Sequence, residues 1–178
     1  MTSNIPAGPE QAAPSAVPEE DLVRISSVIG RLRVLIGRRV ISRVAIENVA
    51  PGAELSYIDV LSVVPPHGPG AADALEGTTV GAVAKAMRID PSRASRLVSD
   101  MVERGLLTRV ASPSDARSSL VVRTGLGERL HAELHAVKLR LLHEVLEDWP
   151  AEDVARFAEL FERFIGLWEN RMDRAGGG

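Results

Sequence analysis

Cysteine is absent from this chain of 178 residues, and its absence excludes several functional classes. Without a thiol there is no disulfide bond, no thiol nucleophile and no cysteine-ligated zinc or iron–sulfur centre. Oxidation sensing through a reactive cysteine is excluded for the same reason. A chain without cysteine is compatible with a reducing compartment, and we expect a cytoplasmic protein.

Aromatic side chains are also scarce, at 3% of the residues. Surfaces that bind carbohydrate or stack nucleic-acid bases rely on aromatic faces, so this composition argues against both. No uninterrupted apolar run reaches the length that crosses a membrane, and residues 1–20 lack the basic start and apolar block of a signal peptide. The apolar fraction of 45% still suffices to bury a core, so we expect a globular protein with no membrane partner.

Charge is small in total but unevenly distributed along the chain. The net charge is −3, which taken alone argues against a nucleic-acid partner. Counted by segment, residues 22–48 carry +5 and residues 78–123 carry +4, whereas residues 1–21, 49–77 and 124–178 carry −4 each. This distribution predicts basic surfaces on an acidic body.

Apolar periodicity and helix-ending residues give the order of the elements. We expect a disordered arm over residues 1–21, which hold four prolines, and a flexible tail over 173–178. The pattern predicts helices over 22–48, 55–64, 80–87, 91–104, 124–148 and 151–171, with two strands over 106–111 and 120–123. Asp21 is predicted to cap the first helix. The predicted fold class is therefore mainly α with one small β-hairpin.

The segment from Thr79 to Arg104 has the pattern of a helix-turn-helix. Thr79 is placed to cap the first helix of the pair, and Asp90 followed by Pro91 is a strong start for the second. Gly105 stands where a left-handed cap would end that second helix.

The second helix of the pair carries small hydroxyl side chains and arginines on the face away from its apolar residues. Small side chains let a helix enter the major groove of DNA, and arginine can bind guanine or phosphate. The alternative is an ordinary amphipathic helix with a solvated polar face. The candidate DNA-binding residues of this helix-turn-helix are Thr79, Ser92, Arg93, Ser95, Arg96 and Ser99.

A hairpin directly after this helix would complete a winged helix. Its predicted tip carries Asp115 and Arg117, two further candidate DNA-binding residues. An arginine at a wing tip can enter a minor groove, where the negative potential is concentrated. The aspartate could hold the arginine in place. The alternative is a solvated turn with an ion pair that contributes little to stability.

The residues from Thr79 to Thr124 resemble the winged helix-turn-helix core of the MarR family of bacterial transcriptional regulators. The resemblance is carried by residues 79–87, 89–98 and 101–109, and by the D-x-R motif that ends at Arg117. It implies a homodimer that binds double-stranded DNA at a pseudo-palindromic operator. It also implies a repressor that a small aromatic or phenolic acid releases.

The same resemblance assigns the regions of the chain. Residues 22–48 and 124–172 would form a helical dimerisation region, and residues 55–123 the winged DNA-binding domain. The loop over 65–77 is longer than is typical of the family, and the proline-rich arm is additional. An effector crevice would lie between the two regions, and the candidate effector-binding residues, chosen by position and chemistry, are Arg39, Arg43, Tyr57 and His67.

Other groupings of residues have simpler interpretations. His131 and His135 lie four residues apart, but no third ligand is set by the sequence, so we expect neither a metal site nor a cofactor. No carboxylate or histidine cluster resembles a catalytic site, so we expect no enzyme. The aromatic residues between Phe157 and Trp168 have heptad-like spacing, which favours a dimer core over a ligand-binding surface. A regulator without an effector and a protein-interaction module with the same fold remain as alternatives.

Overall fold

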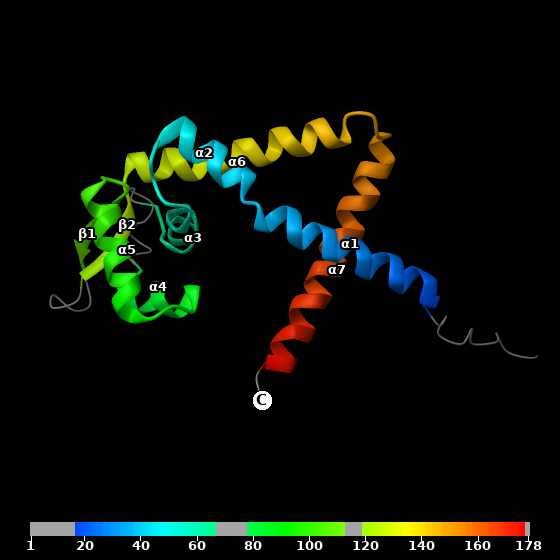
Figure 1. The fold of residues 1–178 in the computed structure, drawn as a ribbon, viewed down its shortest axis with the longest axis horizontal. Helices are drawn as coiled ribbons and strands as arrows, with labels where there is room; N and C mark the ends of the chain where they lie inside the picture. Colours follow the sequence, from blue (N-terminus) through cyan, green and yellow to red (C-terminus); the bar gives the residue numbers. More distant parts are fainter. Residues whose placement is uncertain (1–16, 67–77, 113–118, 177–178) are drawn as a thin grey trace, which may run out of the picture. The chain divides into compact units, whose positions relative to one another are not determined.

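The computed structural model describes residues 17–66, 78–112 and 119–176. These residues form two compact units, Met1–Val40 and Ile41–Gly178, each of which we describe by itself. The predicted class is confirmed, since the described chain is mainly helical with one two-stranded antiparallel hairpin (Figure 1). No helix among the described residues is both long enough and apolar enough to span a bilayer.

The helix predicted over residues 22–48 is two helices, so that prediction was wrong. Helix α1 runs over Glu19–Gly37 and helix α2 over Val40–Val49. Arg39 between them adopts a left-handed backbone with φ of 49°. A continuous α-helix requires a negative φ at every residue, so the left-handed residue ends the first helix.

The predicted cap of the first helix was also wrong. Pro18, not Asp21, occupies the N-cap position, and its carbonyl accepts hydrogen bonds from the backbone N–H of Asp21 and Leu22. The carboxylate of Asp21 lies in the first turn and pairs with Arg24 at 3.1 Å. A negative charge in the first turn of a helix interacts favourably with the positive end of the helix dipole.

The core of the second unit is built around helix α3, Leu55–Val63. Four of its nine residues are buried, and α3 contacts α4, α5 and α6. Its apolar residues pack with buried residues from α2, α4, α5, the hairpin and α6: Ala45, Ile46, Val83, Val98, Met101, Leu106, Leu107, Val121, Leu130 and Val137. Because α5 packs on this core, its position relative to the hairpin is defined.

The predicted helix-turn-helix and hairpin are confirmed. Helix α4 runs over Val80–Met87 and helix α5 over Pro91–Glu103. Strands β1, Leu107–Ala111, and β2, Ser119–Arg123, pair in register from Leu107 opposite Arg123 to Ala111 opposite Ser119. Gly105 has φ of 71°, as expected for the residue that follows the end of α5.

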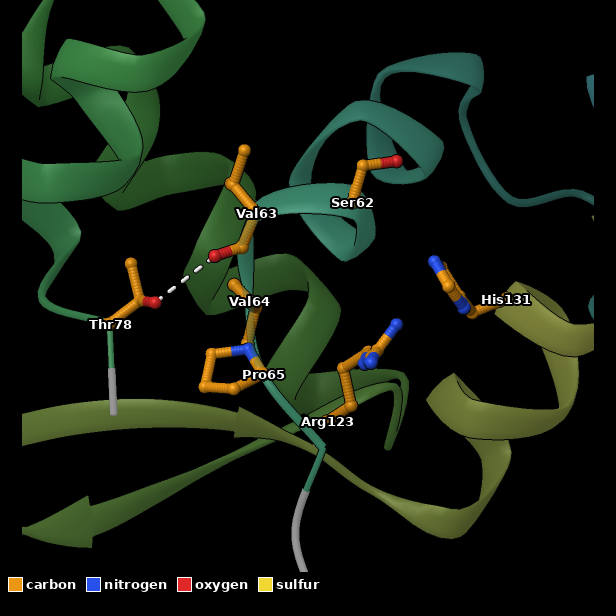
Figure 2. A pocket seen from close by; sticks show the side chains of 7 residues that line it. All are labelled: Ser62, Val63, Val64, Pro65, Thr78, Arg123 and His131. Carbon is orange, nitrogen blue, oxygen red and sulfur yellow. Dashed lines mark hydrogen bonds between the residues drawn. The ribbon is translucent and has the colours of Figure 1, made fainter. Parts of the chain in front are cut away.

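The chain on either side of residues 67–77 is tied to strand β2. Pro66 forms a parallel bridge with Arg123, and Thr78 forms an antiparallel bridge with Val121. The backbone N–H of Arg123 donates to the carbonyl of Pro65 at 2.9 Å. Pro65 and Pro66, the two residues of the predicted loop that the structure describes, therefore lie beside β2, and so does Thr78 (Figure 2).

Two long helices follow the hairpin. Helix α6 runs over Gly125–Leu146, and the hydroxyl of Thr124 caps it by accepting from the N–H of Gly127. Helix α7 runs over Ala151–Gly176, five residues beyond the predicted end at Arg171. None of the side chains described for α7 is buried within one chain.

Helix α6 approaches the backbone closely at Gly127. A Cβ atom at Gly127 would overlap the carbonyl oxygen of Leu106, and it would also lie 3.4 Å from the Cβ of Arg123. A Cβ at Gly125, two residues earlier, would meet nothing closer than a flexible arginine end at 3.9 Å. Gly127 is therefore required for close packing, whereas Gly125 is not.

We therefore expect Gly127→Ala to destabilise the protein by about 1–3 kcal/mol, because the added methyl group must displace backbone at Leu106. Gly125→Ala is the matched control and should change the free energy of unfolding by less than about 1 kcal/mol. Urea unfolding followed by circular dichroism measures both values. Equal stability of the two variants would contradict the close packing at Gly127.

Candidate nucleic-acid interface

Local side-chain chemistry holds the two helices of the helix-turn-helix. The hydroxyl of Thr79 accepts from the N–H of Ala82 at 3.1 Å and so caps α4. Arg88 ends α4 with a left-handed backbone, φ 53°, and the N–H of Ile89 then donates to the carbonyl of Ala84. This tight end directs the chain into α5 after only three residues, Arg88–Asp90.

Asp90 fixes the start of α5 through two hydrogen bonds from Ser92. The backbone N–H of Ser92 donates to the Asp90 carboxylate at 2.8 Å, and the Ser92 hydroxyl donates to the same oxygen. The side-chain hydrogen bond lowers the pKa of Asp90 most, followed by the backbone bond and, with a smaller effect, the charge of Arg96. Ser92 thus acts in the cap, and its hydroxyl proton is already engaged.

The exposed face of α5 carries two arginines and two serines. Ala94, Val98 and Met101 are buried on the opposite face, with Leu97 and Val102 half-buried beside them. Ser92, Arg93, Ser95 and Arg96 are exposed, and Ser99 is half-buried. Within the described part of the chain neither Arg93 nor Arg96 takes part in an ion pair, so both guanidinium groups are available to phosphate or to base edges.

Three further basic residues of this region were not among the predicted site residues. Lys85 of α4, Arg88 of the turn and Arg109 of β1 are all exposed. The positive charge of residues 78–123 includes them, but charge counting alone could not show which cations reach the surface. They supply phosphate-binding chemistry in the same winged-helix region as Arg93 and Arg96.

The predicted wing tip lies outside the described residues. Strands β1 and β2 form the stem of the wing, and Asp115 and Arg117 belong to the segment between them that is not described. Their proposed contact with DNA therefore stays a prediction.

The predicted effector residues have different environments. Arg39 occupies the left-handed position between α1 and α2, and Arg43 is exposed on α2. Tyr57 is completely buried in the core, with the guanidinium of Arg104 5.8 Å from the centre of its ring. His67 lies outside the described residues. The effector-binding role of these four residues stays a prediction, and the burial of Tyr57 argues against its direct contact with a ligand.

The two histidines weighed as metal ligands lie on α6. His131 is half-buried and His135 is exposed. Across residues 17–66, 78–112 and 119–176, no group of three histidine, aspartate or glutamate residues is placed to hold a metal ion.

The winged-helix segment matches a known family. Residues 55–118 match the model described as the MarR family. Over this segment, the chain is similar to the MarR family. The matched residues run from the start of α3 across α4, α5 and β1, so they include the whole helix-turn-helix.

Comparisons by sequence and by structure find several similar proteins. Over 81 residues the chain is 30% identical to the uncharacterized HTH-type transcriptional regulator YxaD of Bacillus subtilis. The aligned residues make up 46% of this chain and 57% of that relative. A MarR family protein of Bacillus stearothermophilus has 21% identity and a TM-score of 0.61, covering 88% of this chain and 99% of that chain. The structure of CouR of Rhodococcus jostii RHA1 bound to p-coumaroyl-CoA has 28% identity and a TM-score of 0.50. The similarity covers 78% of this chain and 92% of CouR. The MarR-like fold therefore extends beyond the matched segment.

The cap of α5 predicts a pH dependence of stability. The pKa of Asp90 is lowered below its ordinary value of 3.8, so the folded state favours the ionised carboxylate. Its contribution is complete above that ordinary value and is lost as the pH falls through the lower folded-state pKa. Asp90→Asn keeps a capping oxygen without titrating, so its melting temperature should fall less than that of the wild type below pH about 4.

Ser92→Ala tests the cause of the shift, because it removes the hydroxyl that lowers the pKa of Asp90 most. The acid-induced loss of stability in Ser92→Ala should be smaller than in the wild type and complete at a higher pH, because the folded-state pKa of Asp90 then lies closer to its ordinary value. Thermal denaturation across an acid pH series measures all three proteins. Parallel curves would show that the cap does not titrate with folding.

Proposed function

We propose that the protein is a homodimeric, sequence-specific DNA-binding transcriptional regulator, a repressor that a small organic acid releases. The exposed face of α5 is the observation that carries the proposal. It presents Arg93 and Arg96 beside the small side chains of Ser92 and Ser95, while its opposite face packs on the core. A helix with this face fits a major groove, and further exposed cations on α4, the turn and β1 would bind the flanking phosphates.

The dimer is supported by apolar faces that one chain leaves exposed. Helix α1 has no buried residue, and its leucine, isoleucine and valine side chains are largely exposed. On α7 the rings of Phe157 and Phe161 stack at 5.5 Å, and those of Phe164 and Trp168 lie 5.6 Å apart. Exposed apolar surface of this extent is uncommon on monomers, so we propose a second copy of the chain as its partner.

One relative supports the proposal of a small organic acid as the effector. CouR, which is 28% identical, has p-coumaroyl-CoA bound, a ligand with a phenolic acyl group. An aromatic or phenolic acid, free or as a thioester, is the corresponding proposal for this chain. A ligand can release DNA only through a difference in its affinity for the DNA-bound and free conformations.

Arg96→Ala tests the DNA interface. If Arg96 binds a guanine, its loss should weaken binding to the operator by about 1–3 kcal/mol per half-site and relax the preference at one base pair. Arg156→Ala, which removes the same charge from an exposed site on α7, is the matched control and should bind as the wild type does. Fluorescence anisotropy with operator and scrambled duplexes over a salt series measures both variants.

Two outcomes of this titration would contradict the proposal. No binding to either duplex and no salt dependence would indicate a protein-interaction module instead. Equal affinity of wild type and Arg96→Ala at every salt concentration would remove α5 from the interface.

Arg117→Ala, by contrast, should weaken binding to both duplexes alike, because a wing arginine is expected to contact phosphate or the minor groove.

The oligomeric state is tested separately by light scattering. We expect twice the mass of one chain at micromolar concentration, and a melting temperature that rises with protein concentration. Phe161→Glu places a charge in the aromatic face of α7 and should reduce the dimer fraction, whereas Glu162→Gln next to it should not. A monomeric wild type would exclude the dimer and the palindromic operator together.

A further inference from the structure

The backbone N–H groups at the start of α5 are taken up by Asp90. Pro91 has no N–H group, the N–H of Ser92 donates to the Asp90 carboxylate at 2.8 Å, and the N–H of Ala94 donates to the Asp90 carbonyl at 3.0 Å. Hydrogen bonds from the side chain and backbone of Ser92 lower the pKa of Asp90 most, and the backbone N–H of Arg93 lowers it further. The carboxylate of Asp90 therefore occupies the position at the end of α5 that a phosphate would otherwise take.

The hydroxyl of Ser92 has its hydrogen directed to the same carboxylate. It donates to Oδ1 of Asp90, because an ionised carboxylate can only accept. A hydroxyl group has one hydrogen and two lone pairs, so Ser92 presents only lone pairs to any other molecule. The carboxylate of Asp90 also has lone pairs beyond those that Ser92 uses. We call the side chains of Asp90 and Ser92 the acceptor pair.

The acceptor pair adjoins the exposed arginines of α5. Asp90 and Ser92 are themselves exposed. The pKa of Asp90 is lowered mainly by Ser92 and, with a smaller effect, by the charge of Arg96, so this guanidinium lies within electrostatic reach of the carboxylate. Nucleic acid that Arg93 and Arg96 attract therefore also meets the acceptor pair.

An acceptor pair that faces DNA selects for hydrogen-bond donors. Phosphate oxygens, O6 and N7 of guanine and O4 of thymine are all acceptors, so an ionised carboxylate repels them. The donors in the major groove are the amino groups of cytosine and adenine. Adenine presents its N7 acceptor beside the amino group, whereas cytosine presents the amino group alone. Cytosine is therefore the base that the acceptor pair fits best.

We propose that Asp90, together with Ser92, recognises a cytosine in each half-site of the operator by accepting a hydrogen bond from its N4 amino group. The proposal rests on the proposed DNA-binding function and adds one defined base to the operator. The guanine paired with this cytosine presents O6 and N7, which are the acceptors that suit Arg96. Asp90 is then a specificity-determining residue as well as the cap of α5.

Selection from a library of random DNA duplexes tests the proposal on the full chain. Wild type and Asp90→Asn each select sites, and both are expected to fold because asparagine caps a helix about as well as aspartate does. Asparagine presents a donor beside its acceptor, the pattern that matches N6 and N7 of adenine. The base that differs between the two sets of sites should be cytosine for the wild type and adenine for Asp90→Asn. A purely structural cap would not change this preference.

Two further variants control for charge and for the hydroxyl. Glu103→Gln removes one negative charge from the other end of α5, away from the acceptor pair, and should select the same sites as the wild type. Ser92→Ala removes one acceptor but keeps the carboxylate, so it should still select cytosine with a weaker preference. Melting temperatures at pH 7 establish that each variant is folded.

Fluorescence anisotropy with one selected duplex measures the size of the effect. Replacement of the cytosine by thymine in one half-site should weaken binding of the wild type by about 5- to 150-fold, the usual cost of one mismatched base pair. Replacement by 2-pyrimidinone, which lacks only the amino group, should weaken the wild type more than Asp90→Asn. The change in the duplex itself is the same for both proteins, so the difference isolates the contact with Asp90.

The outcomes separate this proposal from the proposed regulator. The proposal is overturned if wild type and Asp90→Asn select the same base at every position, or if the base that differs is not cytosine in the wild-type sites. Equal losses of affinity for the 2-pyrimidinone duplex would also overturn it. Sequence-specific binding with an unchanged preference rejects this proposal alone, whereas no binding to any duplex rejects the proposed regulator and this proposal together.

Discussion

The packing of α6 against the chain at Leu106 is the contact on which the winged-helix region depends. The carbonyl of Leu106 accepts from the backbone N–H of Thr124 at 3.1 Å, and the Thr124 hydroxyl lies 3.2 Å from the same oxygen. Gly127 then allows α6 to pass directly over that carbonyl. One peptide group thus joins the end of α5, the start of β1, the end of β2 and the start of α6.

The electrostatic design follows from where the cations lie. The chain as a whole is acidic, and the excess of cations in its central segment is displayed on α4, α5 and β1. On a protein of net negative charge, a positive face attracts nucleic acid to that face and not to the rest of the surface. Arg123 belongs to the same segment by sequence but is buried and paired with Glu128. Charge counting along the chain therefore counts a cation that no DNA phosphate can reach.

The elements that could be predicted from sequence are those with local start and stop signals. Thr79, Asp90 with Pro91, and Gly105 act within a few residues of themselves, and the bounds of α4 and α5 followed from them. The break at Arg39 escaped prediction because a left-handed arginine has no compositional signal, unlike a glycine or proline. The positions of Pro66 and Thr78 escaped prediction for another reason, because only their pairing with β2 brings them beside that strand. The candidate DNA-binding face needed only one helix, so the sequence could place it.

The left-handed residue between α1 and α2 has a mechanical consequence. A non-glycine residue in that conformation costs about 1–2 kcal/mol, and α1 ends before it, at Gly37. Bending resistance between the two helices is therefore lower than within either of them. The break therefore lets α1 change its direction at Arg39 without disrupting the backbone hydrogen bonds within α1 or within α2.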